Sequence, residues 1–114
     1  MENEYYRGDT FVFPFSLQNS DGEKVNFEAG DVLKCGVKTS IYSDEYSLFQ
    51  EITVENKTPE IQIKFLPDET RKLKTRKYML ELELTRNGDV ETIFQQEVKV
   101  KGDVVRNDNT QTSS

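Results

Sequence analysis

The sequence predicts an all-β protein, either a sandwich or a small barrel of about seven short antiparallel strands. Apolar and polar residues alternate along most segments, as in strands that bury one face. Turn-forming residues separate these segments at short intervals. Helical signals interrupt the alternation near 67–74. We favour the sandwich, in which two sheets pack their apolar faces together.

The first strand is predicted over "FVFPFSL", where the alternation is strict. Phe11, Phe13, Phe15 and Leu17 share the face that we expect to be buried. Pro14 lies on the other face and lacks the backbone N–H that a ladder requires. Because sheets tolerate proline at their edges, we expect this strand to lie at an edge.

The middle of the chain predicts four further strands with turns and loops between them. Turn residues occupy Asn19–Gly22 and 55–59. The segment 40–47, "SIYSDEYS", shows no periodicity, so the pattern leaves open whether its apolar side chains are exposed or folded over the sheet. The residues predicted to face inward are Val25, Phe27, Leu33, Cys35, Val37, Leu48, Ile52, Val54, Ile61, Ile63 and Phe65.

A short helical crossover is predicted near 67–74. Asp68 is the expected N-cap of this helix, because its carboxylate can accept a hydrogen bond from a free backbone N–H. Lys72 and Lys74 fall in the expected last turn, where cations interact favourably with the helix dipole. Leu73 is predicted to be buried beneath the crossover.

The last two strands are predicted to form a hairpin. Asn87-Gly88 is a strong signal for its two-residue turn. We expect the sandwich domain to span 1–102 and to be followed by a flexible polar tail, 103–114. The residues predicted to face inward in the hairpin are Tyr78, Leu80, Leu82, Leu84, Val90, Thr92, Phe94, Gln96, Val98 and Val100.

Composition argues against several classes of function. The net charge is −6 over 114 residues, which disfavours binding to nucleic acid or to anionic lipid. The sequence has no histidine, which removes most zinc sites, catalytic triads and general bases. We predict no catalytic residue, no metal site and no cofactor. The single cysteine, Cys35, is in phase with inward residues and is predicted to be a small buried hydrophobe.

Nothing in the sequence indicates a membrane segment or a secretory signal. The first residues, "MENEYYRGDT", contain no apolar stretch, and no run approaches the roughly 18 apolar residues of a membrane span. We therefore expect the chain to fold in the cytosol of its host cell.

Three apolar residues occupy positions where the alternation predicts polar ones. Val12, Met79 and Ile93 are therefore candidate protein contacts, although a polar outer face most often means solubility alone. Arg7-Gly8-Asp9 matches a tripeptide that adhesion receptors read on loops. Because it directly precedes a strand, we expect it to shape the start of that strand instead.

Tyr78 begins a strand directly after the helical crossover. In immunoglobulin-like sandwiches, a tyrosine at this place hydrogen-bonds its hydroxyl back to the upstream backbone. We therefore expect Tyr78 to form such a corner.

The two ends of the sandwich resemble the small immunoglobulin-like domains of tailed-phage structural proteins, especially the N-terminal domain of baseplate upper proteins. The likeness covers nearly the whole chain, from about Arg7 to Val105. It consists of the strand start "RGDT", the turn "NSDG", a short crossover before the tyrosine-led strand "KYMLELEL", and a closing hairpin that runs into "DVV".

This resemblance implies an immunoglobulin-like β-sandwich with a structural, non-enzymatic role in the virion. The partners would be other virion structural proteins, and the chain itself could form a homo-oligomer. The alternative is a carbohydrate-binding or adhesion module that recognises a host cell surface. An enzyme is the least favoured class. The candidate sugar contacts are Tyr5, Tyr6, Tyr42 and Tyr46.

Overall fold

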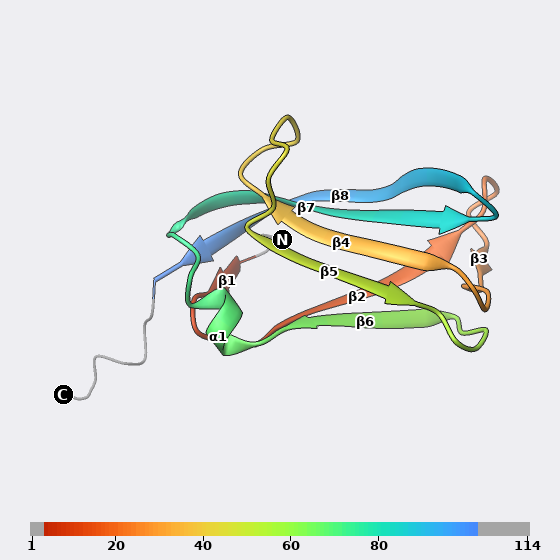
Figure 1. Ribbon diagram of the computed structural model, residues 1–114, viewed down its shortest axis with the longest axis horizontal. Helices are drawn as coiled ribbons and strands as arrows, with labels where there is room; N and C mark the ends of the chain where they lie inside the picture. Colours follow the sequence, from red (N-terminus) through yellow and green to blue (C-terminus); the bar gives the residue numbers. More distant parts are fainter. Residues whose placement is uncertain (1–3, 103–114) are drawn as a thin grey trace.

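The alternating segments form eight strands in the computed structural model, which describes residues 4–102 (Figure 1). One helical turn precedes the last two strands. The elements are β1 (Glu4–Tyr6), β2 (Phe11–Gln18), β3 (Lys24–Val25), β4 (Val32–Lys38), β5 (Leu48–Thr53), β6 (Glu60–Phe65), α1 (Pro67–Thr70), β7 (Arg76–Arg86) and β8 (Asp89–Lys101). The predicted tail, 103–114, lies outside the described residues.

The strands form two sheets, which confirms the all-β sandwich. A five-stranded sheet has the order β1-β8-β7-β4-β5, and a three-stranded sheet has the order β3-β2-β6. The sequence did not predict β1, which pairs with β8 in parallel, whereas the other ladders are antiparallel.

The core lies between the sheets and consists almost entirely of the residues predicted to face inward. In β2, buried and exposed residues alternate without a break from Phe11 to Gln18. Val25 is an exception, because it lies exposed on the two-residue strand β3. The largest fully buried hydrophobic side chains are Phe11, Phe27, Phe65, Leu33, Ile63, Leu82, Val37 and Val100.

The expected edge position of Pro14 is confirmed. From Phe11 to Ser16, β2 pairs with β6 alone, and β3 joins its other side only at Leu17 and Gln18. Over this stretch β2 therefore has one open side, and sheets tolerate proline in such a strand. A proline at such an edge also opposes sheet-to-sheet aggregation.

A β-bulge shifts the alternation in the first half of β8. Leu82 pairs with Phe94, but the next residue of β7 pairs with Thr92, so Ile93 is an extra residue. The prediction that Val90 and Thr92 face the core is therefore wrong. Val90 is 62% exposed, whereas Ile93 is half-buried against the core.

The helical crossover is shorter than the sequence predicted. A proline at the first helical position makes Leu66 the N-cap, so the prediction that Asp68 caps the helix is wrong. Lys72 and Lys74 both follow the end of α1 and do not lie in its last turn. Leu73 is 3% exposed, which confirms that it is buried beneath the crossover.

The turn before β2 is attached to this crossover by a buried threonine. The Thr70 hydroxyl donates a hydrogen bond to the Asp9 carbonyl (2.7 Å) and accepts one from the Gly8 N–H (3.0 Å). Gly8 has a φ of 86°, a conformation that favours glycine. The Arg7 guanidinium donates to the Leu73 carbonyl. The Arg-Gly-Asp sequence thus forms a structural turn.

The tyrosine corner is present as predicted. The backbone N–H of Lys74 donates to the Tyr78 hydroxyl (2.9 Å), and this hydroxyl lies 3.2 Å from the Lys74 carbonyl, to which it donates. The Arg76 guanidinium lies over the Tyr78 ring, 5.5 Å from its centroid. We call the segment 66–78 the corner.

The opposite end of the sandwich is held by a bidentate ion pair. Arg86, at the end of β7, donates from Nε and Nη2 to the two carboxylate oxygens of Asp31 (2.8 and 2.6 Å). The Glu28 N–H donates to the same carboxylate (2.9 Å). The hydrogen bonds from Arg86 hold the pKa of Asp31 below its usual value, although its burial opposes this shift.

Candidate functional site

Exposed apolar side chains concentrate in one short segment of the chain. Among the described residues, eight large apolar side chains are exposed, and four of them lie within 41–49. These are Ile41, Tyr42, Tyr46 and Phe49, with Tyr42 87% exposed. Met79 lies beside them on β7. We call these five residues the loop face, because large exposed apolar groups that cluster in this way are typical of a contact surface.

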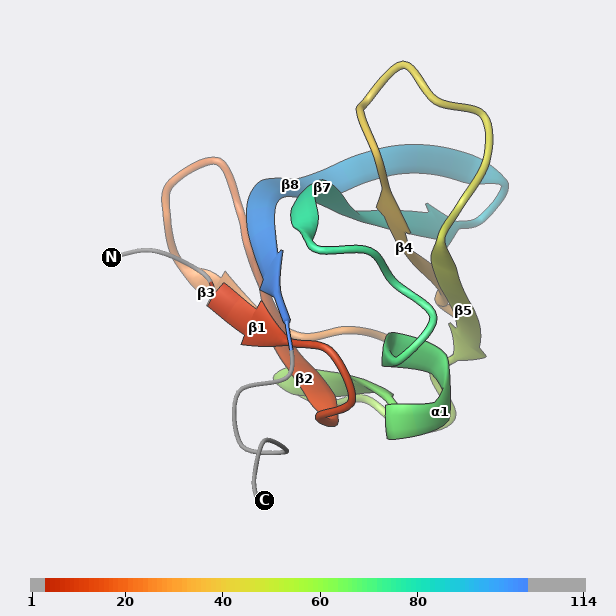
Figure 2. The same cartoon turned by 90° about the vertical axis from the view of Figure 1, so that its left-hand side faces the viewer.

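The loop that carries most of the loop face joins two neighbouring strands, β4 and β5. It spans 39–47 and projects away from the five-stranded sheet (Figures 1 and 2). Short local hydrogen bonds support it. The Tyr42 N–H donates to Ser40 Oγ (3.2 Å), and the Ser43 N–H donates to the Ser40 carbonyl (3.1 Å). The Ser47 N–H donates to the Val37 carbonyl (2.7 Å), which ties the loop to β4.

Tyr46 is folded back onto the sheet because a glycine leaves room for its ring. A Cβ atom on Gly36 would lie 2.1 Å from Tyr46 Cε1, so any larger residue there would displace the ring. The Tyr46 ring also contacts Phe49, with centroids 5.0 Å apart. Lys38 Nζ covers it at 5.1 Å from the centroid. Tyr46 therefore anchors the second half of the loop to the sheet.

Lys38 connects these rings to Met79. The Cα positions of Lys38 and Met79 are cross-strand partners, so their side chains share the outer face of the sheet. The ammonium of Lys38 is paired with Glu81 (3.1 Å), and both side chains are largely buried. Lys38 therefore lies between the Tyr46 ring and Met79 on this face.

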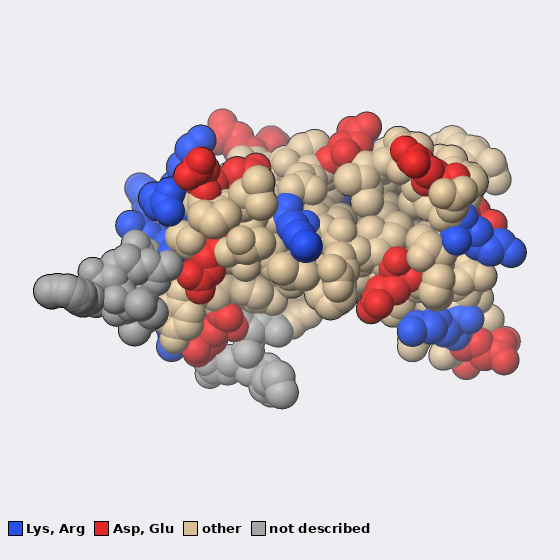
Figure 3. All heavy atoms as spheres, turned by 90° about the horizontal axis from the view of Figure 1, so that it is seen from below, with Lys and Arg blue, Asp and Glu red and all other residues tan. Residues whose placement is uncertain are grey.

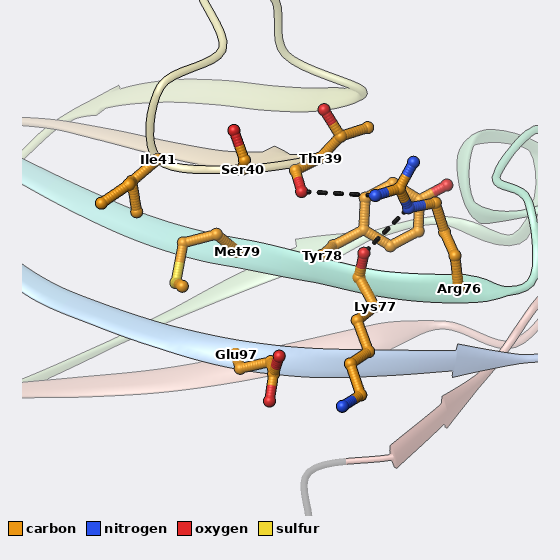
Figure 4. Close-up of a pocket in the computed structure, with 8 residues that line it drawn as sticks. All are labelled: Thr39, Ser40, Ile41, Arg76, Lys77, Tyr78, Met79 and Glu97. Carbon is orange, nitrogen blue, oxygen red and sulfur yellow. Dashed lines mark hydrogen bonds between the residues drawn. The ribbon is translucent and has the colours of Figure 1, made fainter.

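A hollow of about 270 Å³ opens between the base of the loop and β7 (Figure 4). Ile41, from the base of the loop, and Met79, from β7, both line it. The Arg76 guanidinium donates to the Thr39 carbonyl (3.5 Å), which joins β7 to the start of the loop. The residues that line the hollow are Thr39, Ser40, Ile41, Arg76, Lys77, Tyr78, Met79 and Glu97.

Basic side chains gather at the corner, next to this hollow. The segment 71–77 contains five Lys and Arg residues and no Asp or Glu. Figure 3 shows the opposite side of the molecule, where the Lys and Arg side chains at the corner end are mixed with Asp and Glu. The loop face therefore lies next to positive charge in a protein whose net charge is negative.

The three predicted protein contacts do not form one surface. Met79 is half-buried in the loop face, on the outer side of the five-stranded sheet. Val12 is exposed on β2, which belongs to the other sheet. Ile93 lies at the bulge of β8 and packs against the core. Met79 alone joins the loop face.

The four candidate sugar-binding tyrosines lie in two separate places. Tyr42 and Tyr46 belong to the loop beside β5, whereas Tyr5 and Tyr6 lie on β1, at the other edge of the same sheet. Tyr5 packs against Phe11 and Phe13, with centroids 5.0 and 5.1 Å away, and burial raises its pKa. Tyr6 is half-buried. The loop pair is therefore separate from the β1 pair.

Sequence reasoning named neither Ile41 nor Phe49 of the loop face as a candidate contact. Ile41 lies in the segment 40–47, whose exposure the pattern left open. Phe49 is the clearer omission. It lies on the outer face of β5, between the inward-facing Leu48 and Gln50. Its signal was present, because Phe49 is a large apolar residue out of phase with Leu48 and Ile52.

Cys35 shows no sign of reactivity. It is completely buried, as predicted, and burial raises its pKa to about 12. Within residues 4–102, no group of three or more Asp, Glu, His or Cys side chains is placed to hold a metal ion. In the same range, no helix is long and apolar enough to cross a membrane.

Comparisons with protein-family models, curated proteins and solved structures found no significant match to this chain.

Proposed function

We propose that this chain is a non-enzymatic structural or adaptor module of a phage or prophage particle, of the tail or baseplate type. It acts by docking onto other virion proteins through the loop face. The observation that carries the docking role is the concentration of exposed aromatic side chains on one projecting loop. The resemblance of "RGDT", "NSDG" and the tyrosine-led strand to phage domains supports the proposal that the particle is a phage or prophage virion.

The loop face has the chemistry of a protein contact. Tyrosine is enriched among interface residues that dominate binding energy, because it offers a large, rigid apolar area and a polar tip. Tyr46 and Phe49 are already ordered by their contact with each other, with centroids 5.0 Å apart. Docking therefore requires little additional ordering of these side chains. Repetition of such a contact around a symmetric particle would hold the module firmly, even if each contact is weak.

A carbohydrate-binding module is the second candidate, because Tyr42 and Tyr46 are both exposed on one loop. A sugar ring would stack on an open aromatic face. However, the Tyr46 ring lies against the sheet and is covered by Lys38, which leaves Tyr42 as the open ring of the pair. The loop face therefore supports protein docking better than sugar binding.

The proposed function is tested in particles produced by the source strain. Phage particles are induced, purified on a density gradient, and analysed by quantitative mass spectrometry for this chain. We expect the wild-type chain at a fixed number of copies per particle. The double variant Tyr42→Ser, Phe49→Ser should be incorporated at a much lower level, because both side chains belong to the loop face.

Val90→Ser is the matched control, because Val90 is an exposed apolar residue far from the loop, at the β7–β8 hairpin. It should be incorporated at the wild-type level. Absence of the wild-type chain from purified particles would refute the proposed function. Saturable binding on a glycan array that the Tyr42→Ser variant loses would favour the carbohydrate module instead.

A further inference from the structure

We propose that the loop face binds a second copy of this chain in a two-fold symmetric contact. Tyr42 of each copy enters the hollow of the other copy, between its Ile41 and Met79. This inference rests on the proposed function, because it assigns a partner to the same surface. Three features support it: the size of the hollow, the charges around it, and the position of the loop beside it.

The size of the hollow suits a single aromatic side chain. Its volume is about 270 Å³, whereas pockets for drug-sized ligands measure about 300–1,000 Å³. The apolar side chains of Ile41 and Met79 both line it (Figure 4). The most exposed large apolar side chain of the described residues, Tyr42, lies on the adjoining loop. A tyrosine ring would fill the hollow and keep its hydroxyl near the polar rim.

The charges of the loop and of the rim are complementary. Asp44 and Glu45 follow Tyr42 on the loop, and both are exposed. Arg76 and Lys77 line the hollow together with Glu97. Lys99 is the cross-strand partner of Lys77 and adds a third cation on the outer face of the sheet. Insertion of Tyr42 would bring two carboxylates to a rim with a net positive charge.

The position of the loop makes the contact self-complementary. The loop and the hollow lie next to each other, so a two-fold axis can place each loop over the other copy's hollow. The tip cannot fill its own hollow while Ser40 Oγ and the Ser40 carbonyl hold the backbone N–H groups of Tyr42 and Ser43 in a tight turn. Such an isologous contact closes at two copies and does not grow into a filament.

The full chain is tested by size-exclusion chromatography with light scattering and by sedimentation equilibrium over a range of concentrations. We expect a reversible dimer with twice the chain mass of 13.2 kDa. The dimer should weaken when the salt concentration rises from about 0.05 to 0.5 M, because the contact includes exposed charges. Tyr42→Ser should raise the dimer Kd about tenfold or more. Val90→Ser should leave the Kd unchanged.

A charge exchange gives the sharper test. The first variant, Asp44→Lys with Glu45→Lys, has a basic loop and a basic rim. The second, Lys77→Glu with Lys99→Glu, has an acidic loop and an acidic rim. Each variant alone should be monomeric, because a dimer of it would place like charges against each other. An equimolar mixture should form a 1:1 heterodimer, since both of its contacts join opposite charges.

Circular dichroism and denaturant unfolding of each variant show whether it remains folded. Folded wild-type chain that stays monomeric at every concentration would overturn the self-docking inference. A folded mixture that forms no heterodimer would overturn the assigned contact. Either result leaves the proposed function standing if the chain is still found in purified particles, where the loop face would bind a different virion protein.

Discussion

The corner and the 39–47 loop both connect strands at the same end of the sandwich, yet they use their side chains in opposite ways (Figure 1). In the corner, Thr70, Leu73 and Tyr78 are buried, and the hydroxyls of Thr70 and Tyr78 are hydrogen-bonded to backbone groups. In the loop, Ile41 and Tyr42 are exposed. The corner stabilises the fold, whereas the loop leaves its apolar surface available to a partner.

This difference leads to a general expectation. Substitutions of the buried residues of the corner should lower the free energy of unfolding and leave docking intact in whatever fraction remains folded. Substitutions at the tip of the loop should weaken docking and leave the free energy of unfolding nearly unchanged. Four substitutions test this separation, each with a control of similar chemistry.

Leu73→Ala should have the largest effect on stability. Leu73 is 3% exposed, so the change removes buried apolar surface and leaves a cavity under the corner. We expect a loss of about 2–5 kcal/mol in the free energy of unfolding, measured with urea. Leu66→Ala is the control, because Leu66 is 58% exposed and its change should be within about 0.5 kcal/mol. Equal effects of the two variants would contradict the packing described for the corner.

Asp31→Asn extends the comparison to the far end of the sandwich. It replaces one of the two carboxylate oxygens that accept from Arg86 with an amide NH2 and removes the negative charge. Hydrogen bonds to charged groups contribute about 1.5–3 kcal/mol. Because the folded state holds the pKa of Asp31 below its usual value, the carboxylate stabilises the fold fully above a pH of about 4. This contribution is lost as the pH falls through the lowered pKa.

The measurement is urea unfolding from pH 7 to pH 2. The difference in stability between wild type and Asp31→Asn should be constant near neutral pH and shrink in acid. Glu28→Gln keeps the backbone N–H that Asp31 binds, so it should follow the wild-type curve closely. A difference that persists undiminished at pH 2 would show that ionisation of Asp31 is not responsible.

Tyr78→Phe isolates the hydroxyl of the corner. The Lys74 N–H and carbonyl would lose their hydrogen-bond partner in a partly buried site. We expect a loss of about 1–2 kcal/mol, seen as a lower melting temperature. Tyr42→Phe removes the same hydroxyl from an exposed ring and should leave the melting temperature unchanged. An unchanged melting temperature for Tyr78→Phe would rule out a stabilising corner.

Of the four substitutions, Gly36→Ala should change the free energy of unfolding least and the conformation of the loop most. The new Cβ would overlap the Tyr46 ring, which is at the surface and can swing outward. We expect the free energy of unfolding to change by less than about 1 kcal/mol, and contacts between the Tyr46 and Phe49 rings to disappear from NMR spectra. Gly102→Ala is the control, because its Cβ would make an ordinary contact with Thr75. Persistence of the ring contacts would contradict the role given to Gly36.

The core of the fold could be predicted because strand alternation is local and repeats over many residues. The strict pattern from Phe11 to Leu17 placed one face inward, and the single proline placed the strand at an edge. The parallel strand β1 could not be predicted, since its partner residues begin at Lys99 and the two segments show no shared pattern. The bulge at Ile93 was equally hidden, because alternation does not reveal where a residue is inserted.

The candidate site was predicted only in part. Met79 was named from its position in the alternation, and Tyr42 and Tyr46 from their residue type. Loops have no periodicity that tells an exposed ring from a packed one. The orientation of Tyr46 depends on Gly36, which lies on β4, outside the loop, and makes room for the ring. The hollow likewise requires β7 and the loop to be adjacent, and this adjacency is a property of the tertiary structure.

Because Cys35 is fully buried, a cysteine introduced at the surface can be labelled selectively. The Cys35 thiol stays protonated at ordinary pH, with a pKa of about 12, and no solvent reaches it in the folded state. A cysteine introduced by Tyr42→Cys or Val90→Cys would consequently be the sole thiol open to a maleimide dye. Fluorophores attached at those two sites would report distances from the loop and from the hairpin without removal of the native sulfur.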